Sequence, residues 1–126
     1  METNTSDTKQ YTKQLLELYL RTPGTLGRIR REDRRLAVEL HDRGIPLLTV
    51  EASFVLTTAR RCLRAPDAPA LRPVRSLHYF VPVIEELLAN PLPVDYLEYL
   101  RGKLKKIQAA HEDKVLNNNS RQHKPR

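Results

Sequence analysis

Cysteine and tryptophan are almost missing from this chain of 126 residues, which contains Cys62 alone and no tryptophan. A single cysteine excludes an internal disulfide and a cysteine-based zinc site, so we expect a reducing compartment, the cytoplasm. The apolar runs are much shorter than the roughly 18 residues that cross a bilayer, and the polar start METNTSDTKQ is unlike a secretory signal peptide. We therefore expect no membrane partner.

Acidic residues are the minority, because 15 Asp and Glu face 22 Lys and Arg, which gives a net charge of +7. Residues 21–75 hold 12 basic and 6 acidic residues, 101–126 hold 8 and 2, and 76–100 hold none and 4. Every basic residue of 21–75 is arginine, which makes bidentate contacts with phosphates and guanine edges. This favours a nucleic-acid partner, DNA in the first place. A genome rich in G and C would also enrich arginine without any such function.

The spacing of apolar residues predicts an all-α bundle of about five helices, because no segment alternates with the period of two that a strand requires. The predicted helices are 9–21, 30–43, 46–63, 76–89 and one after Pro93 that frays near Glu112. Gly44 suits a left-handed helix cap, and Pro82 predicts a kink or a restart near Tyr79. We expect a flexible leader at 1–8, one helical domain at 9–113 and a disordered basic tail at 114–126.

One hydrophobic core is expected from the apolar faces of these helices. Its predicted members are Leu36, Leu40, Leu48, Ala52, Val55, Leu56, Ala59, Phe80, Ile84, Leu97, Leu100 and Leu104. Cys62 lies next to the apolar stripe of the third helix and is expected to be a small buried side chain.

Residues 34–64 read as helix, short glycine-containing turn and helix, the order in which a second helix is presented to the major groove. Polar residues recur at helical spacing on the second of these helices. They are Ser53, Thr57, Arg60 and Arg64, with Arg61 beside them. Hydroxyls and guanidiniums on one stripe fit contacts with phosphates and base edges. The alternative is an ordinary helical hairpin with a solvated face.

A denser cluster precedes this motif and forms a second candidate nucleic-acid contact, made of Arg28, Arg30, Arg31, Arg34 and Arg35. Glu32, Asp33 and Glu39 lie within a turn of it and are expected to pair with its arginines. Arg60 and Arg64 have no acidic neighbour on their own helix within two turns, because Glu51 lies further back and Asp67 falls beyond the break at Pro66. We therefore expect Arg60 and Arg64, rather than the denser cluster, to face nucleic acid.

Catalytic and metal-binding motifs are missing: the sequence has no glycine-rich phosphate loop, no nucleophile elbow and no clustered metal ligands. We expect no enzyme activity, no metal and no cofactor. The acidic block 76–100 suggests an alternative function, a protein-interaction adaptor. Its candidate partner-binding residues are Glu85, Glu86, Asp95, Tyr96 and Tyr99.

Two resemblances point to DNA handling. Residues 43–61 followed by 75–86 (RSLHYFVPVIEE) resemble the C-terminal half of DnaD-like replication-initiation domains, although the proline-rich spacer, Pro82 and the missing tryptophan depart from that pattern. The stretch SLHYFVPVIEE together with RREDRRLA is similar to small uncharacterised proteins found beside integrases and transposases of bacterial mobile elements. Both resemblances imply an accessory role in replication or in a mobile element, with a further replication or recombination protein as partner. Neither implies a catalytic residue or an oligomeric state.

Overall fold

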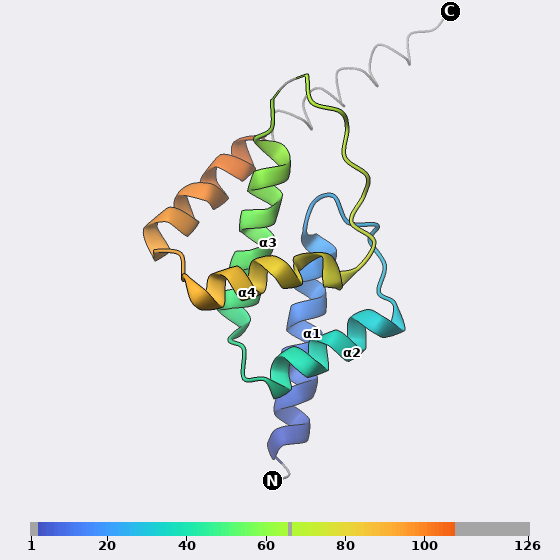
Figure 1. Ribbon diagram of the computed structural model, residues 1–126. Coiled ribbons are helices and arrows are strands. Elements are labelled where there is room, and N and C mark those ends of the chain that lie inside the picture. The colour runs from blue at the N-terminus through green and yellow to red at the C-terminus, as the bar shows by residue number, and fades with distance from the viewer. Residues whose placement is uncertain (1–2, 66, 108–126) are drawn as a thin grey trace, which may run out of the picture.

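The computed structural model describes residues 3–65 and 67–107, and the described part of the chain is helical without a strand (Figure 1). Its elements are α1 (Thr3–Arg21), α2 (Arg31–Asp42), α3 (Leu47–Cys62), the 3₁₀ helix η1 (Leu77–Phe80), α4 (Val81–Ala89) and a final helical stretch at 94–107. The predicted all-α class is confirmed. The predicted fraying near Glu112 and the basic tail 114–126 lie outside the described residues.

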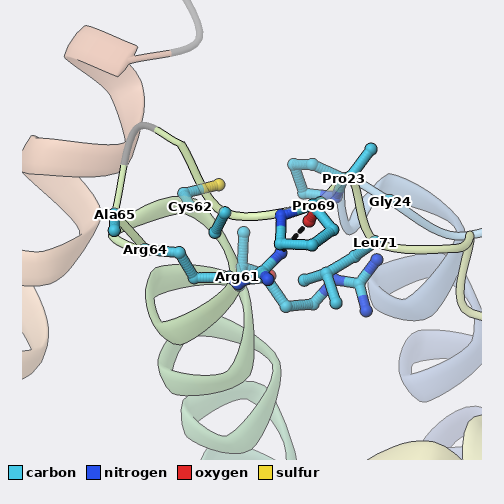
Figure 2. A pocket seen from close by; sticks show the side chains of 11 residues that line it. Pro23, Gly24, Arg61, Cys62, Arg64, Ala65, Pro69 and Leu71 are labelled. Atoms are coloured by element: carbon cyan, nitrogen blue, oxygen red, sulfur yellow. Dashed lines mark hydrogen bonds between the residues drawn. The ribbon is translucent and has the colours of Figure 1, made fainter.

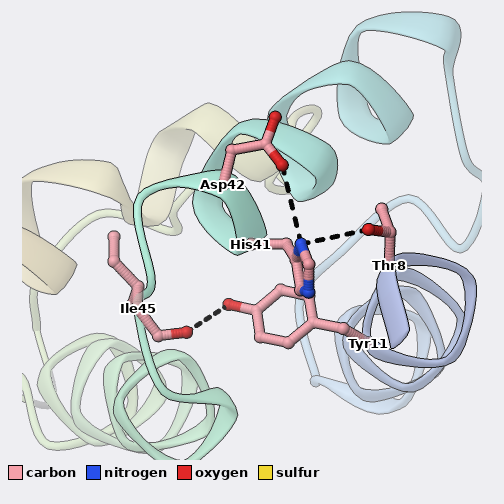
Figure 3. A network of polar contacts seen from close by, with 5 residues as sticks. All are labelled: Thr8, Tyr11, His41, Asp42 and Ile45. Atoms are coloured by element: carbon pink, nitrogen blue, oxygen red, sulfur yellow. Dashed lines mark hydrogen bonds and ion pairs between the residues drawn. The ribbon is translucent and has the colours of Figure 1, made fainter. Parts of the chain in front are cut away.

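Helix α1 begins at Thr3, so residues 3–8, which the sequence analysis assigns to a flexible leader, lie within a helix. Composition suggested that this polar segment could not repay the entropy of ordering. Within this segment Thr8 contacts α2, because its hydroxyl is 3.2 Å from Nδ1 of His41 (Figure 3). Tyr11 donates a 2.7 Å hydrogen bond to the carbonyl of Ile45, and its ring meets the His41 ring edge-on at 5.1 Å. These contacts hold α1 against the end of α2.

The turn between α2 and α3 forms as the sequence predicts. Gly44 has a φ of 73°, and its N–H donates to the carbonyl of His41 while the N–H of Ile45 donates to Leu40. This pair of bonds is a Schellman motif, which glycine allows because it lacks a Cβ. Pro46 then precedes the first residue of α3, a position at which its missing N–H removes no helical hydrogen bond.

Proline 82 restarts the helix, as predicted, instead of breaking it. Residues Leu77–Phe80 form η1 and α4 follows directly, with Pro82 in its first turn.

Upstream, the proline-rich segment runs back across the surface, and Val74 pairs with the loop after α1. Its N–H donates to the carbonyl of Gly24 at 2.6 Å, and its carbonyl accepts from the N–H of Leu26 at 3.0 Å.

Two hydrophobic clusters form the core, and α3 contributes to both. The larger lies between α1, α2, η1 and one side of α3, where the rings of Phe54 and Phe80 are 4.7 Å apart. The smaller joins the other side of α3 to α4 and residues 94–107 through Leu56, Leu87 and Leu97. Because α3 is packed on two sides, half of it is buried.

The predicted core residues divide between these two clusters instead of forming one core, but most of them are buried as predicted: Leu36, Leu40, Ala52, Leu56, Ala59, Phe80, Ile84, Leu97 and Leu100. Val55 and Leu104 are partly buried against the smaller cluster. Leu48 was predicted wrongly, because it is 59% exposed at the first turn of α3. Val50 and Phe54, which the prediction omitted, take its place in the larger cluster. The prediction assumed that α3 buries a single stripe.

None of the helices within residues 3–65 and 67–107 combines the length and the apolar character that crossing a membrane requires.

Candidate nucleic-acid interface

The predicted polar stripe on α3 is partly inside the protein. Ser53 has no exposed surface and its hydroxyl donates a 2.6 Å hydrogen bond to the carbonyl of Val50. Thr57 is buried as well, with 5% exposure. Both lie on the helix that the two clusters enclose. The expectation that Ser53 and Thr57 contact nucleic acid is therefore wrong.

Arg60 is exposed, but its charge is compensated. Its guanidinium makes two hydrogen bonds to the carboxylate of Glu86 on α4, one of them 3.0 Å long. This contact raises the pKa of Arg60 and lowers that of Glu86. The expectation that Arg60 carries an uncompensated charge is wrong, because its partner is close in space and distant in sequence.

Arg61 and Arg64 hold the proline-rich segment against the end of α3. Arg61 donates to the hydroxyl of Tyr79 at 3.0 Å and to the carbonyl of Arg72 at 2.7 Å, with its guanidinium 5.4 Å from the Tyr79 ring centre. Arg64 donates to the carbonyl of Pro69 at 2.8 Å. These two side chains have a structural role that the sequence did not indicate.

A cleft of about 440 Å³ lies between these arginines and the loop, and Figure 2 shows Arg61 and Arg64 facing the segment that carries Pro69 and Leu71. Cys62 lines this cleft and is exposed, so its predicted burial is wrong. It occupies the last position of α3, beyond the turns that the two clusters cover.

The predicted helix-turn-helix presentation is also wrong in its second half. Helix α2 packs against α1 and η1, while α3 packs against α1, η1 and α4. A recognition helix must expose the residues that enter the groove. Helix α3 is instead the central helix of the fold, with its middle turns buried.

The denser arginine cluster is arranged differently, at the surface around the start of α2. We call its exposed side chains, together with that of Arg75, the arginine surface: Arg28, Arg30, Arg31, Arg34, Arg35 and Arg75. The ion pairs between described residues involve His41, Arg43, Arg60 and Arg101, and none involves the arginine surface. The expected pairing with neighbouring carboxylates is therefore not found in the described part of the chain.

Asp33 explains part of this result. It has no exposed surface, and its carboxylate accepts from the N–H groups of Arg30 and Leu77, each at 2.9 Å. The Ser76 hydroxyl donates a longer hydrogen bond, of 3.4 Å, to the same carboxylate. The Asp33 carboxylate therefore bonds to groups of the protein itself. These bonds bring residues 76–77, and with them Arg75, to the start of α2.

Sequence reasoning missed Arg75 and the buried role of Asp33. A signal for Asp33 existed, because an acidic residue at the third helical position often bonds back to the cap N–H. Arg75 is brought to the start of α2 by the hydrogen bonds that Ser76 and Leu77 make to Asp33. These bonds join residues that are 43 and 44 positions apart in the chain. No local pattern encodes these contacts.

The acidic face of the alternative function is partly neutralised. Glu85 accepts two hydrogen bonds from Arg43, at 2.9 and 3.1 Å, which lower its pKa, and Glu86 is bound by Arg60. Asp95 remains exposed. Tyr96 and Tyr99 are exposed and stacked, with ring centres 6.1 Å apart.

Within the residues described, no group of three or more His, Cys, Asp or Glu side chains is placed to hold a metal ion. Comparison with protein-family models, curated proteins and solved structures finds no match to this chain.

Proposed function

We propose that this chain binds nucleic acid, duplex DNA in the first place, through the arginine surface at the start of α2. The observation that carries the proposal is the gathering of exposed arginines for which the described residues supply no ion-pair partner. Unpaired guanidiniums are free to bind phosphates and to release the counterions around them.

The position of these arginines supports a function in binding rather than in folding. The N-terminus of a helix carries a positive partial charge, so basic side chains there destabilise the helix by a few tenths of a kcal/mol each. Arg31, Arg34 and Arg35 lie in the first turns of α2, where they add to that field. Arg31 and Arg35 are one turn apart and share a side of the helix. This arrangement concentrates positive potential where an anionic backbone would bind.

Within this proposal the protein is an accessory factor of replication or of a mobile genetic element, as the two resemblances imply, with another replication or recombination protein as partner. The adaptor alternative has weaker support. Of its candidate residues, Glu85 and Glu86 are bound by arginines of the same chain. Tyr99 is contacted by Lys103, so Asp95 and Tyr96 are the candidates left for a basic partner.

A salt titration tests the proposal. A short labelled duplex is titrated with the full chain between about 50 and 200 mM salt, and each phosphate contact contributes about −0.9 to the log–log slope. We expect a slope that corresponds to several contacts. Absence of binding at the lowest salt, or a slope near zero, would contradict the proposal. Single-stranded DNA and duplex RNA in the same assay decide whether DNA is the preferred ligand.

A further inference from the structure

A second surface adjoins the arginine surface at Arg34, which lines a groove of about 430 Å³ between α1 and α2. Apolar side chains from both helices and from the loop between them line it: Leu16, Leu20, Ile29 and Val38. Leu20 is 41% and Val38 38% exposed. An open groove with this lining can bury apolar side chains of another molecule.

The charges at this groove have mostly one sign. Lys9, Lys13 and Arg34 line it together with a single carboxylate, Glu17. Within residues 3–65 and 67–107, the side chains of Lys9, Lys13 and Arg34 make no ion pair and no hydrogen bond. A ligand that fits must therefore bring both apolar groups and negative charge.

The groove follows α1 from Lys9 to Leu20, a length of about 16 Å at 1.5 Å per residue. Leu16 and Leu20 are one turn apart on α1, and Arg34 and Val38 are one turn apart on α2. Apolar anchors on one face of an α-helix recur with the same spacing. A helix of about three turns would place its anchors along the groove.

We propose that this groove binds an acidic amphipathic helix of a partner protein, with its apolar side chains between α1 and α2 and its carboxylates beside Lys9, Lys13 and Arg34. Charge complementarity selects this occupant. Bare nucleic acid has no apolar face for Leu20 and Val38. The chain's own residues 108–126 carry 4 lysines and arginines against 2 acidic residues, so they have the wrong sign.

The binding test uses three fluorescein-labelled helical peptides and contains no nucleic acid, so its outcome is independent of the proposed function. The first peptide has leucines at positions i, i+4, i+7 and i+11 with glutamates beside them. The second replaces the glutamates by lysines, and the third replaces the leucines by alanines. We expect saturable binding of the first to the full chain, and binding at least about tenfold weaker for the other two. No binding of the first peptide, or equal binding of all three, would overturn the proposal.

Matched variants locate the site. Leu20 and Leu88 are both 41% exposed, but only Leu20 lines the groove. Leu20→Gln should weaken the first peptide about tenfold and Leu88→Gln less than about twofold. Lys13→Glu should likewise weaken it more than Lys106→Glu, which makes the same change of charge outside this groove. Arg34 is unchanged in every variant, and circular dichroism confirms folding.

Equal effects within either pair of variants would place the peptide elsewhere and overturn the proposal. The same would follow from a concentration-dependent dimer of the wild type that Leu20→Gln abolishes, because a second copy of the chain would then occupy the groove.

Discussion

Asp33 shows how one buried side chain determines the arrangement at the candidate interface. Its carboxylate accepts hydrogen bonds from the N–H of Arg30, at the start of α2, and from the N–H of Leu77, at the start of η1. A charged acceptor of this kind contributes more than a neutral one, because each bond is charge-assisted. The short segment that carries Arg75 is positioned by the same carboxylate.

Removing this carboxylate should be costly. Asp33→Ala leaves the buried N–H of Leu77 and the partly buried N–H of Arg30 without an acceptor, and we expect it to lower the free energy of unfolding by about 2–4 kcal/mol. Asp42→Ala is the matched control, since the side chain of Asp42 is 69% exposed and should cost less than about 1 kcal/mol. Urea unfolding measures both variants. Equal costs would show that the Asp33 bonds do not hold the two segments together.

Tyr11 gives the protein a dependence on alkaline pH. Burial raises the pKa of Tyr11 to about 12, above its ordinary value of 10.0. The stability that follows from this shift is fully present below pH 10 and is lost as the pH rises through about 12, because only the unfolded chain then ionises easily.

We therefore expect Tyr11→Phe to cost about 0.5–1.5 kcal/mol at neutral pH, through loss of the bond to Ile45, and to cost progressively less above pH 10. Unfolding in denaturant at a series of pH values measures the difference between wild type and variant. Burial also raises the pKa of Tyr19, but Tyr19 is present in both proteins, so its effect cancels. A difference that stays constant up to pH 12 would contradict this expectation.

At the scale of elements, the sequence predicted the helices better than their orientations. The Gly44 cap, the break at Pro46 and the restart at Pro82 depend on local backbone chemistry, and each formed as expected. The sequence did not predict how much of α3 is buried. A helix packed on two sides buries residues that would be exposed if only a single apolar stripe were packed. Ser53 and Thr57 were misjudged for this reason.

Two leucines of α3 test its orientation. Leu56 is 7% and Leu48 59% exposed. Leu56→Ala should lower the free energy of unfolding by about 2–5 kcal/mol, and Leu48→Ala by less than about 1 kcal/mol. Midpoints of chemical unfolding give both values. If Leu48→Ala cost as much as Leu56→Ala, the first turn of α3 would be packed differently from the structure.

At the scale of the whole molecule, the contacts between elements decide which charges remain available to a ligand. Composition predicted the excess of arginine, but it could not separate arginines with internal partners from those without. Arg60 is bound by Glu86, which lies 26 positions along the chain, and Arg61 and Arg64 are bound by the proline-rich segment. The candidate cluster at the start of α2 was visible in the sequence. The sequence did not show that Arg60 and Arg64 have partners within the chain, whereas the described residues supply no ion-pair partner to the cluster.

The central claim is that nucleic acid contacts the arginine surface and not the arginines of α3. Two double variants that remove the same charge test it: Arg31→Gln with Arg35→Gln, and Arg60→Gln with Arg64→Gln. We measure the salt dependence of duplex DNA binding for both, with thermal unfolding as the check on folding. The first should reduce the log–log slope by about two and the second should leave it unchanged, because each lost phosphate contact removes about one unit. A reduced slope for the second variant, with the slope of the first intact, would contradict the claim.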